Sequence, residues 1–198
     1  MKDFNPFSLA GKRILVSGAT SGLGYETALT CARMGAEVIG SGRDPVRLES
    51  TLDSLRQISD LPHQMVSADL TDELQRLEIV SQLGGPINGV VHSAGISRLS
   101  PVRMMNAQHL REVQAINVDA PTLLTQALLK NNLIAQGGSI VFIASIAAHI
   151  GVPGVAAYSG TKAALIAITR CLAMEVYKRR IRANCLSPAL VETPLLDA

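Results

Sequence analysis

The chain has 198 residues, of which 47% are hydrophobic and 17% charged, with 18 basic and 16 acidic side chains. This composition is typical of a compact globular domain and excludes an intrinsically disordered chain. The near balance of charge, without any block of like charge, argues against a surface built for nucleic acid or for a membrane.

The N-terminal segment and the cysteines bear on localisation. MKDFNPFSLAGKR lacks the apolar run of a signal peptide, and no segment approaches the about 20 apolar residues of a membrane span. The three cysteines, Cys31, Cys171 and Cys185, are odd in number and far apart. They favour reduced thiols in a cytoplasmic protein over disulfides or metal ligands. No histidine pair stands at i, i+4, so no metal site is expected.

Short apolar runs alternate with helical patterns along the chain. The runs predict strands at residues 13–18, 36–42, 63–70, 88–95, 138–145 and 181–188. The helical patterns predict helices at 22–34, 44–58, 71–83, about 106–135 and 157–178. Asp44 and Thr71 are the expected N-caps, and Leu74 and Leu77 share one face of the third helix. This alternation predicts a single α/β domain, residues 1–198: a doubly wound parallel sheet with helices on both faces, in three α/β/α layers.

The first strand leads into a glycine-rich turn, SGATSGLG, which contains Gly18, Gly22 and Gly24. The spacing is G-x-x-x-G-x-G rather than the commoner G-x-G-x-x-G. Glycines at this place let the backbone approach a pyrophosphate at the N-terminus of the next helix. A plain tight turn is the alternative, but the position between the first strand and the first helix favours dinucleotide binding.

The ends of the second and third strands bear on which dinucleotide is bound. The second strand runs into GSGRD, so that Arg43 stands where a guanidinium would bind the 2′-phosphate of NADP. NADP(H) is therefore favoured over NAD(H). The alternative is an ordinary exposed Arg43, with Asp44 turned back to a ribose. Asp69, after the third strand, is expected beside the adenine, with a helix cap as its other possible role.

Four polar residues form a candidate catalytic group: Asn117, Ser145, Tyr158 and Lys162. Each has an ordinary explanation, since serine is common in turns and tyrosine in packing. Tyr158 and Lys162, however, are four residues apart and share a helix face. A nearby cation lowers the pKa of a phenol from about 10, which makes it a workable acid or base. Ser145 could then polarise a carbonyl oxygen, and this chemistry needs no metal.

In their order and spacing these motifs resemble those of the short-chain dehydrogenase/reductase family, along nearly the whole chain. The resemblance implies a Rossmann-type fold and an Asn–Ser–Tyr–Lys tetrad. Tyr158 would be the general acid and base, and Lys162 would hold the nicotinamide ribose and depress the tyrosine pKa. Ser145 would orient the substrate carbonyl, and Asn117 would support a water molecule in a proton relay.

The resemblance also implies a set of cofactor contacts, in which Thr193 reaches the nicotinamide carboxamide and Val191 offers backbone groups beside it. The full set is Gly18, Ser21, Gly22, Leu23, Gly24, Arg43, Asp69, Leu70, Ala94, Gly95, Tyr158, Lys162, Pro188, Val191 and Thr193.

The chain departs from the family pattern at several positions. The usual Asn-Asn-Ala-Gly reads His92-Ser93-Ala94-Gly95, the usual Pro-Gly reads Pro188-Ala189, and Ser17 stands where threonine is frequent. Members of the family usually continue past this point with a substrate loop, a helix and a seventh strand. We therefore expect the natural chain to extend beyond Ala198, because the sixth strand would otherwise be an exposed edge.

The sequence thus predicts an NADP(H)-dependent oxidoreductase that acts on a carbonyl or secondary alcohol. A 3-oxoacyl thioester is one candidate substrate, as in the 3-oxoacyl-carrier-protein-reductase-like branch of the family. The alternatives are a non-catalytic dinucleotide sensor, which would not need Tyr158 and Lys162, and a nucleotide-sugar epimerase or dehydrogenase, which would need a longer chain. The expected partner is a small-molecule substrate. A homodimer or homotetramer is also expected, because the helices predicted at 106–135 and 157–178 carry many small apolar residues.

Overall fold

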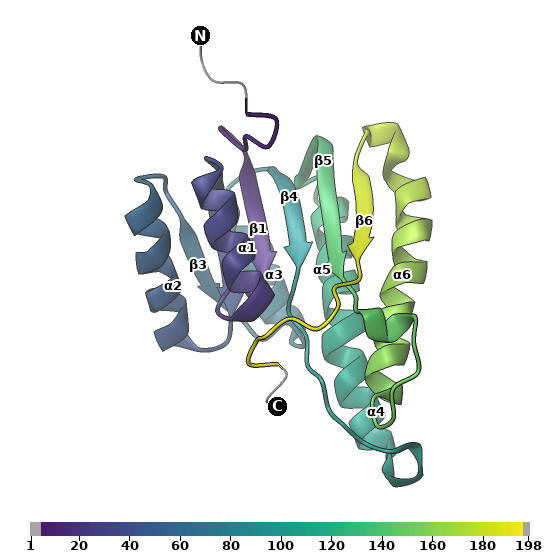
Figure 1. Ribbon diagram of the computed structural model, residues 1–198. Helices are drawn as coiled ribbons and strands as arrows, with labels where there is room; N and C mark the ends of the chain where they lie inside the picture. The colour runs from purple at the N-terminus through teal and green to yellow at the C-terminus, as the bar shows by residue number, and fades with distance from the viewer. Residues whose placement is uncertain (1–4, 196–198) are drawn as a thin grey trace.

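The computed structural model describes residues 5–195 and contains, within them, a six-stranded sheet (Figure 1). The spatial order is β3-β2-β1-β4-β5-β6, and each neighbouring pair is parallel. The order reverses between β1 and β4, which lie at the centre of the sheet. The strands are β1 (Arg13–Ser17), β2 (Glu37–Gly42), β3 (Gln64–Ser67), β4 (Ile87–His92), β5 (Ile134–Ile143) and β6 (Arg182–Leu186).

Helices connect successive strands. They are α1 (Gly22–Arg33), α2 (Pro45–Ile58), α3 (Glu73–Gln82), α4 (Ala107–Gln114), α5 (Ala120–Lys130) and α6 (Ala156–Val176). Short 3₁₀ turns occupy Val102–Met104, Ile146–Ala148 and Tyr177–Arg179. None of the helices in the described part of the chain has the length and apolar composition needed to span a bilayer.

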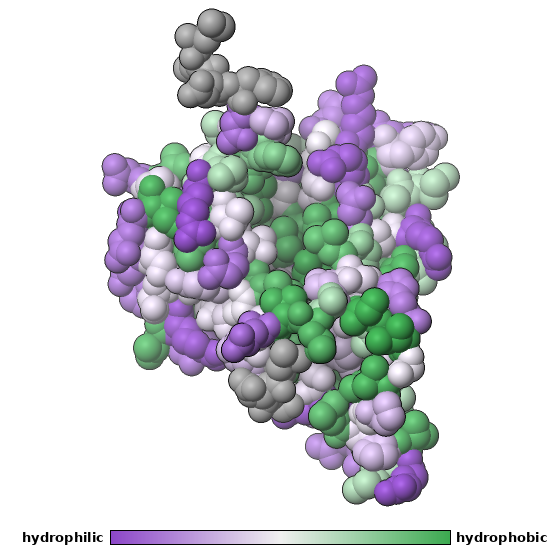
Figure 2. Space-filling view, viewed as in Figure 1, coloured by the Kyte–Doolittle hydropathy of each residue, from purple (hydrophilic) through white to green (hydrophobic). Residues whose placement is uncertain are grey.

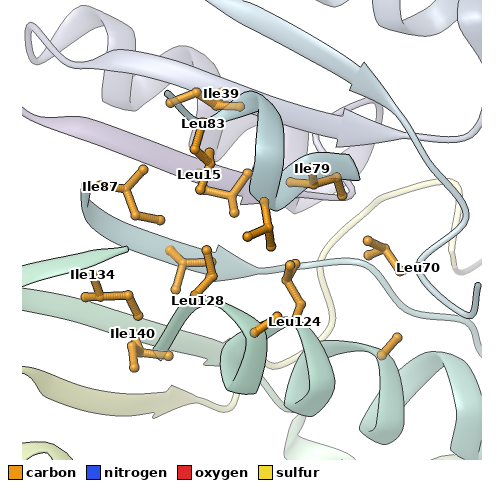
Figure 3. Close-up of a cluster of buried hydrophobic side chains, with 14 of the residues drawn as sticks. Leu15, Ile39, Leu70, Ile79, Leu83, Ile87, Leu124, Leu128, Ile134 and Ile140 are labelled. Atoms are coloured by element: carbon orange, nitrogen blue, oxygen red, sulfur yellow. The ribbon is translucent and has the colours of Figure 1, made fainter. Parts of the chain in front are cut away.

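The sheet is the middle of three layers, as the sequence predicts, and the Rossmann-type fold is confirmed. On one face, Ile14, Val16 and Val38 pack against apolar residues of α1 and α2, which lie in front of the sheet in Figure 1. The opposite face packs against α3, α5 and α6. Its core, part of which is drawn in Figure 3, includes Leu15, Ile39, Ile79, Leu124, Leu128, Ile140, Phe142, Leu165 and Leu172. Successive residues of β1 thus enter different cores, which explains why this strand is an unbroken apolar run.

The long helical region predicted at about 106–135 is confirmed for residues 107–130 and wrong beyond them. The structure has α4, a wide π-helical turn at Ala115–Asp119, and α5, which ends at Lys130. Pro121 has no N–H to donate to the preceding turn. Just before it the helical hydrogen bonds change to the i to i−5 pattern of a π-helix, since the Ala120 N–H bonds to the Ala115 carbonyl. After α5 the chain turns at Asn132, which has a left-handed φ of 55°. β5 then begins at Ile134, four residues before the predicted start at 138.

Of the two N-caps predicted from the sequence, one is confirmed and the other is wrong. Asp44 caps α2 as predicted, since its carboxylate accepts the N–H groups of Val46 and Arg47. The expected Thr71 cap is wrong, because α3 begins two residues later and Asp72 accepts the Gln75 N–H. The face of α3 that carries Leu74 and Leu77 is exposed, and its buried residues are Arg76, Ile79 and Val80.

Candidate active site

A cleft of about 730 Å³ lies at the carboxyl ends of the strands. It is lined by the turns after β1 to β5, by the first turns of α6 and by residues 188–195. Figure 1 shows the C-terminal segment crossing the strand ends from β6 toward β1. All of the predicted site residues line this cleft except Gly24 and Asn117. Segments that are distant in the sequence therefore meet where ligands bind in doubly wound sheets.

The glycine-rich turn passes so close to the end of β4 that side chains are excluded. Gly18 has a φ of +70°, and a Cβ on it would lie 2.7 Å from the backbone nitrogen of Ala94. A Cβ on Gly24 would overlap the carbonyl oxygen of Gly18. Glycine is thus needed at both positions for the chain to turn from β1 into α1.

The start of α1 faces the cleft without an internal cap. Ser21 is its N-cap residue but makes no side-chain capping bond, and the first turn carries no acidic residue. Ser21, Gly22 and Leu23 line the cleft, and a Cβ on Gly22 would meet the Thr193 side chain at 3.1 Å. The first backbone N–H groups of α1 and the positive end of its dipole are therefore available to an anion.

Two arginines line the cleft beyond β2, namely Arg43 and Arg47. Asp44 is held by its role in the helix cap. One of its oxygens accepts the N–H groups of Val46 and Arg47, and the other accepts the Arg47 Nε–H at 3.0 Å. The backbone hydrogen bond from Arg47 holds the pKa of Asp44 below its usual value. A ribose contact from Asp44, the alternative raised by the sequence, would have to compete with these bonds.

Asp69 and Leu70 line the cleft after β3. Asp69 accepts hydrogen bonds from the backbone N–H of Thr71 at 2.9 Å and from its hydroxyl at 2.7 Å. The backbone bond is the main cause of the lowered pKa of this carboxyl group. Since Asp72 caps α3, the helix-cap role considered for Asp69 is wrong.

Ser145, Tyr158 and Lys162 line the same part of the cleft. Ser145 follows β5 and accepts the Ala147 N–H at 3.1 Å. The Lys162 ammonium is almost fully buried, donates to the Ile143 carbonyl at 2.8 Å, and lies 5.5 Å from the centre of the Tyr158 ring. Burial lowers the pKa of Lys162 to about 8.

The expected lowering of the Tyr158 pKa is not found in this structure. Burial raises the pKa of the phenol, and the Ser145 hydroxyl opposes that rise without reversing it. The lysine ammonium lies over the aromatic ring and is bonded to the Ile143 carbonyl. Desolvation of the phenolate is therefore the largest influence on the Tyr158 pKa.

Asn117 lies in the π-helical turn and is buried behind the cleft. Its amide oxygen accepts the Ile96 N–H at 2.9 Å, and its amide nitrogen donates to the Ile96 carbonyl at 3.0 Å and to the Thr161 hydroxyl at 3.1 Å. A Cβ on Gly95 would lie 3.2 Å from the Asn117 Oδ1 and 3.4 Å from the Lys162 Nζ. Asn117 thus ties the segment after β4 to α6, beside the lysine.

His92, which replaces the first asparagine of the usual family motif, is a packing residue. Its ring is buried, stacks on Phe142 with centroids 4.8 Å apart, and bonds through Nε2 to the Thr125 hydroxyl at 2.8 Å. Burial lowers the pKa of His92 to about 3, so the ring is neutral.

Several lining residues were not predicted. Arg47 had a signal in the sequence, since it lies in the first turn of the helix that follows Arg43. The apolar residues of the loops had none, because nothing in their spacing distinguishes them from ordinary surface positions. They include Leu99, Ile146, Ile150, Val152 and Leu190. Within residues 5–195 the structure gathers no three side chains suited to hold a metal ion.

Doubly wound sheets bind dinucleotides where the strand order reverses. Here that point lies between β1 and β4, beside the glycine-rich turn and a pair formed by the half-buried Tyr158 and the buried Lys162. Together they define the class of dinucleotide-dependent oxidoreductases.

The family model for short chain dehydrogenases matches residues 12–198, and the chain belongs to the short-chain dehydrogenase/reductase family. It is 33% identical over 194 residues to L-xylulose reductase of Caenorhabditis elegans, covering 96% of this chain and 75% of the relative. It is 31% identical over 194 residues to a 3-oxoacyl-[acyl-carrier-protein] reductase of Thermotoga maritima, covering 96% and 78%.

A short chain dehydrogenase from Burkholderia cenocepacia J2315, solved in complex with NADP, superimposes with a TM-score of 0.87 at 26% identity, over 94% of this chain and 77% of that one. The protein is accordingly an oxidoreductase of alcohol and carbonyl groups that uses a nicotinamide cofactor.

Proposed function

We propose that the protein is an NADP(H)-dependent reductase of a small carbonyl compound, with Tyr158 as its general acid and base. One observation carries the proposal: Ser145, Tyr158 and Lys162 line the same cleft as the glycine-rich turn. A dinucleotide with its pyrophosphate at that turn would extend its nicotinamide, the hydride donor, toward the proton donor Tyr158, and carbonyl reduction requires the two donors side by side.

The residues of the cleft fit a dinucleotide. Gly18 and Gly24 permit a backbone approach that a Cβ would block, and the uncapped start of α1 suits a pyrophosphate. The proposed contacts are the set implied by the family resemblance: Gly18, Ser21, Gly22, Leu23, Gly24, Arg43, Asp69, Leu70, Ala94, Gly95, Tyr158, Lys162, Pro188, Val191 and Thr193.

The preference for NADP(H) is supported by charge. Arg43 and Arg47 bring two guanidinium groups to the end of the cleft beyond β2, while Asp44 is engaged in the α2 cap. A guanidinium can bind a 2′-phosphate through two hydrogen bonds. A carboxylate that instead bonded the 2′-hydroxyl would favour NAD(H).

When bound, the nicotinamide supplies or accepts the hydride. Ser145 holds the substrate oxygen, and Tyr158 donates a proton to it in reduction or removes one in oxidation. Partial burial raises the pKa of Tyr158, which keeps the phenol protonated at neutral pH and supports its role as the acid of the reduction. Lys162 supplies a cation beside the phenol and the cofactor ribose. Asn117 supports the proton relay and holds the segment at Ile96 in place.

The substitution Tyr158→Phe tests this mechanism. Loss of the phenolic proton should lower kcat by about 10²–10⁴-fold, the usual contribution of a general acid. The affinity for NADPH, measured by fluorescence titration, should stay nearly unchanged, because the ring remains. Steady-state kinetics on a panel of carbonyl compounds provides the rate. Unchanged turnover in Tyr158→Phe would overturn the mechanism, and NADPH binding without turnover of any compound by the wild-type protein would favour the sensor.

Three finer proposals accompany this function. The relative from Thermotoga maritima supports a 3-oxoacyl thioester as one candidate substrate. The free thiols of Cys31, Cys171 and Cys185 support a reducing, cytoplasmic location. Exposed apolar residues on α6 support a homodimer or homotetramer.

A further inference from the structure

Charged and apolar side chains occupy opposite parts of the cleft. Its charged lining residues are Arg43, Arg47, Asp69 and Lys162. The first three lie at the β2–β3 end, and the Lys162 ammonium is buried on the Ile143 carbonyl. Around Ser145 and Tyr158, the lining drawn from residues 95–155 and 188–195 carries no charged side chain among those the structure describes.

That uncharged part is rimmed by large apolar side chains that remain in contact with water. They come from three segments: the stretch after β4, the loop after β5 and the stretch after β6. Figure 2 shows hydrophobic side chains gathered on this face of the molecule. The rim consists of Leu99, Ile146, Ile150, Val152, Leu190, Val191 and Leu195, which are between 36% and 83% exposed.

The cations nearest in sequence to this rim are engaged elsewhere or lie outside it. Arg98 pairs with Glu112 of α4 at 3.5 Å, and neither Arg98 nor Arg103 is part of the cleft lining. A carboxylate or phosphate on the substrate would thus lose water at the rim without gaining a partner. Even partial loss of water by such an unpaired charge is unfavourable, whereas each Å² of apolar surface removed from water gains about 25 cal/mol.

We propose that the substrate is an uncharged carbonyl compound with an alkyl or aryl body, free of carboxylate, phosphate and polyhydroxyl groups. This class selects against the 3-oxoacyl thioester considered above, because such thioesters are borne on carriers that contain phosphate. This inference rests on the proposed function and names the substrate class of the same site. The apolar rim binds the body of the molecule, while Ser145 and Tyr158 bond its only polar atom. Discrimination against anions then comes from the absence of a cation in this part of the lining, and discrimination against sugars from its few polar side chains, since Ser97 and Thr193 are its only hydroxyl groups besides Ser145 and Tyr158 among the described residues.

The test compares three ketones with NADPH and the full chain: acetophenone, para-acetylbenzoate and fructose. The first two differ by a single carboxylate. The kcat/KM for acetophenone should exceed each of the others by at least about tenfold, which corresponds to 1.4 kcal/mol of lost contact. Equal or better turnover of the carboxylate or the sugar would overturn the substrate class and leave the reductase intact. No turnover of any carbonyl compound would overturn the proposed function, and the substrate class with it.

Two variants make the comparison sharper. Val152→Arg and Leu99→Arg each add a cation to the rim, from different segments. Either change should raise kcat/KM for para-acetylbenzoate and lower it for acetophenone, with unchanged NADPH binding. The matched control is Leu74→Arg, an exposed leucine on α3 that does not line the cleft. The quantity to compare is the ratio of kcat/KM for acetophenone to kcat/KM for para-acetylbenzoate. If this ratio is the same in both rim variants as in Leu74→Arg, the rim does not contact the substrate and the inference fails.

Discussion

At the scale of single residues, His92 shows how a departure from the family pattern is accommodated. The Thr125 hydroxyl donates its only proton to the Pro121 carbonyl at 2.8 Å, so His92 must donate to it from Nε2. The Nδ1 atom is then an acceptor, and it has no hydrogen-bond partner among the residues that the structure describes. The ring is thus held neutral by one donated bond and by stacking on Phe142.

This arrangement predicts an acid-sensitive fold. The pKa of His92 is about 3 in the folded protein and about 6.5 in an unfolded chain. Between about pH 6.5 and pH 3 the unfolded state binds one more proton than the folded state. The free energy of unfolding should therefore decrease as the pH is lowered, by up to about 1.4 kcal/mol per pH unit. Urea unfolding between about pH 7 and 4 measures this slope. His92→Asn should reduce the slope but not abolish it, because burial also lowers the pKa of His63. His149→Asn, an exposed control, should leave the slope as it is. Equal slopes for the wild type and His92→Asn would contradict the prediction.

Arg43 is the residue on which the cofactor preference depends. Arg43→Ala should raise the Kd for NADPH by about tenfold to a hundredfold, as expected for loss of a hydrogen bond to a charged group worth about 1.5–3 kcal/mol. The Kd for NADH should hardly change, since NADH lacks the 2′-phosphate. Arg56→Ala is the control, because Arg56 pairs with Glu49 and Asp53 and lies outside the cleft lining. A wild-type preference for NADH, or equal weakening of both cofactors, would refute the role.

At the scale of helices and strands, α6 combines the catalytic pair with an apolar outer surface. Tyr158 and Lys162 are in its first turns, while Ala163, Ala167, Cys171 and Met174 lie exposed at helical spacing further along. Residues at this spacing lie along one side of a helix, so the four side chains form a single apolar stripe. We expect this stripe to be the contact surface between copies of the chain.

Ala167→Glu should therefore shift the protein toward monomers in sedimentation velocity, because a carboxylate buried between two helices lacks a partner. Ser50→Glu on the exposed side of α2 provides the matched control. A wild-type protein that sediments as a monomer at every concentration would end the proposal, and an oligomer unaffected by Ala167→Glu would exclude this stripe as its interface.

The order of strands and helices was predictable because each strand here is a short apolar run that leads into a turn signal. The boundary between α5 and β5 was not predictable from the sequence. The segment LLKNNLIAQGGSIVF is apolar on both sides of Asn132 and suits a helix or a strand equally well. The same limit applies to Asn117. Its residue type marked it as exceptional in a helix, but its bonds to Ile96 and Thr161 depend on segments that meet only in the folded chain.

At the scale of the whole molecule, most of the cleft could be predicted because a parallel sheet brings the ends of all its strands to one edge. Gly18, Arg43, Asp69, Gly95 and Ser145 each follow a strand, and all of them line the cleft. The apolar rim could not be predicted, because it comes from irregular loops whose course depends on what they pack against.

The parallel sheet has a final consequence, for the assembly of the protein during its synthesis. The Arg13 N–H at the start of β1 bonds to the Asn88 side chain in β4, 75 residues away. At roughly 5–20 residues per second, the ribosome takes about 4–15 s to make that stretch. Until then the central strand pairs only with β2, and its second edge stays open. Such non-local parallel pairing is slow, so the newly made first half of the sheet is the stage at which we expect chaperones to be needed.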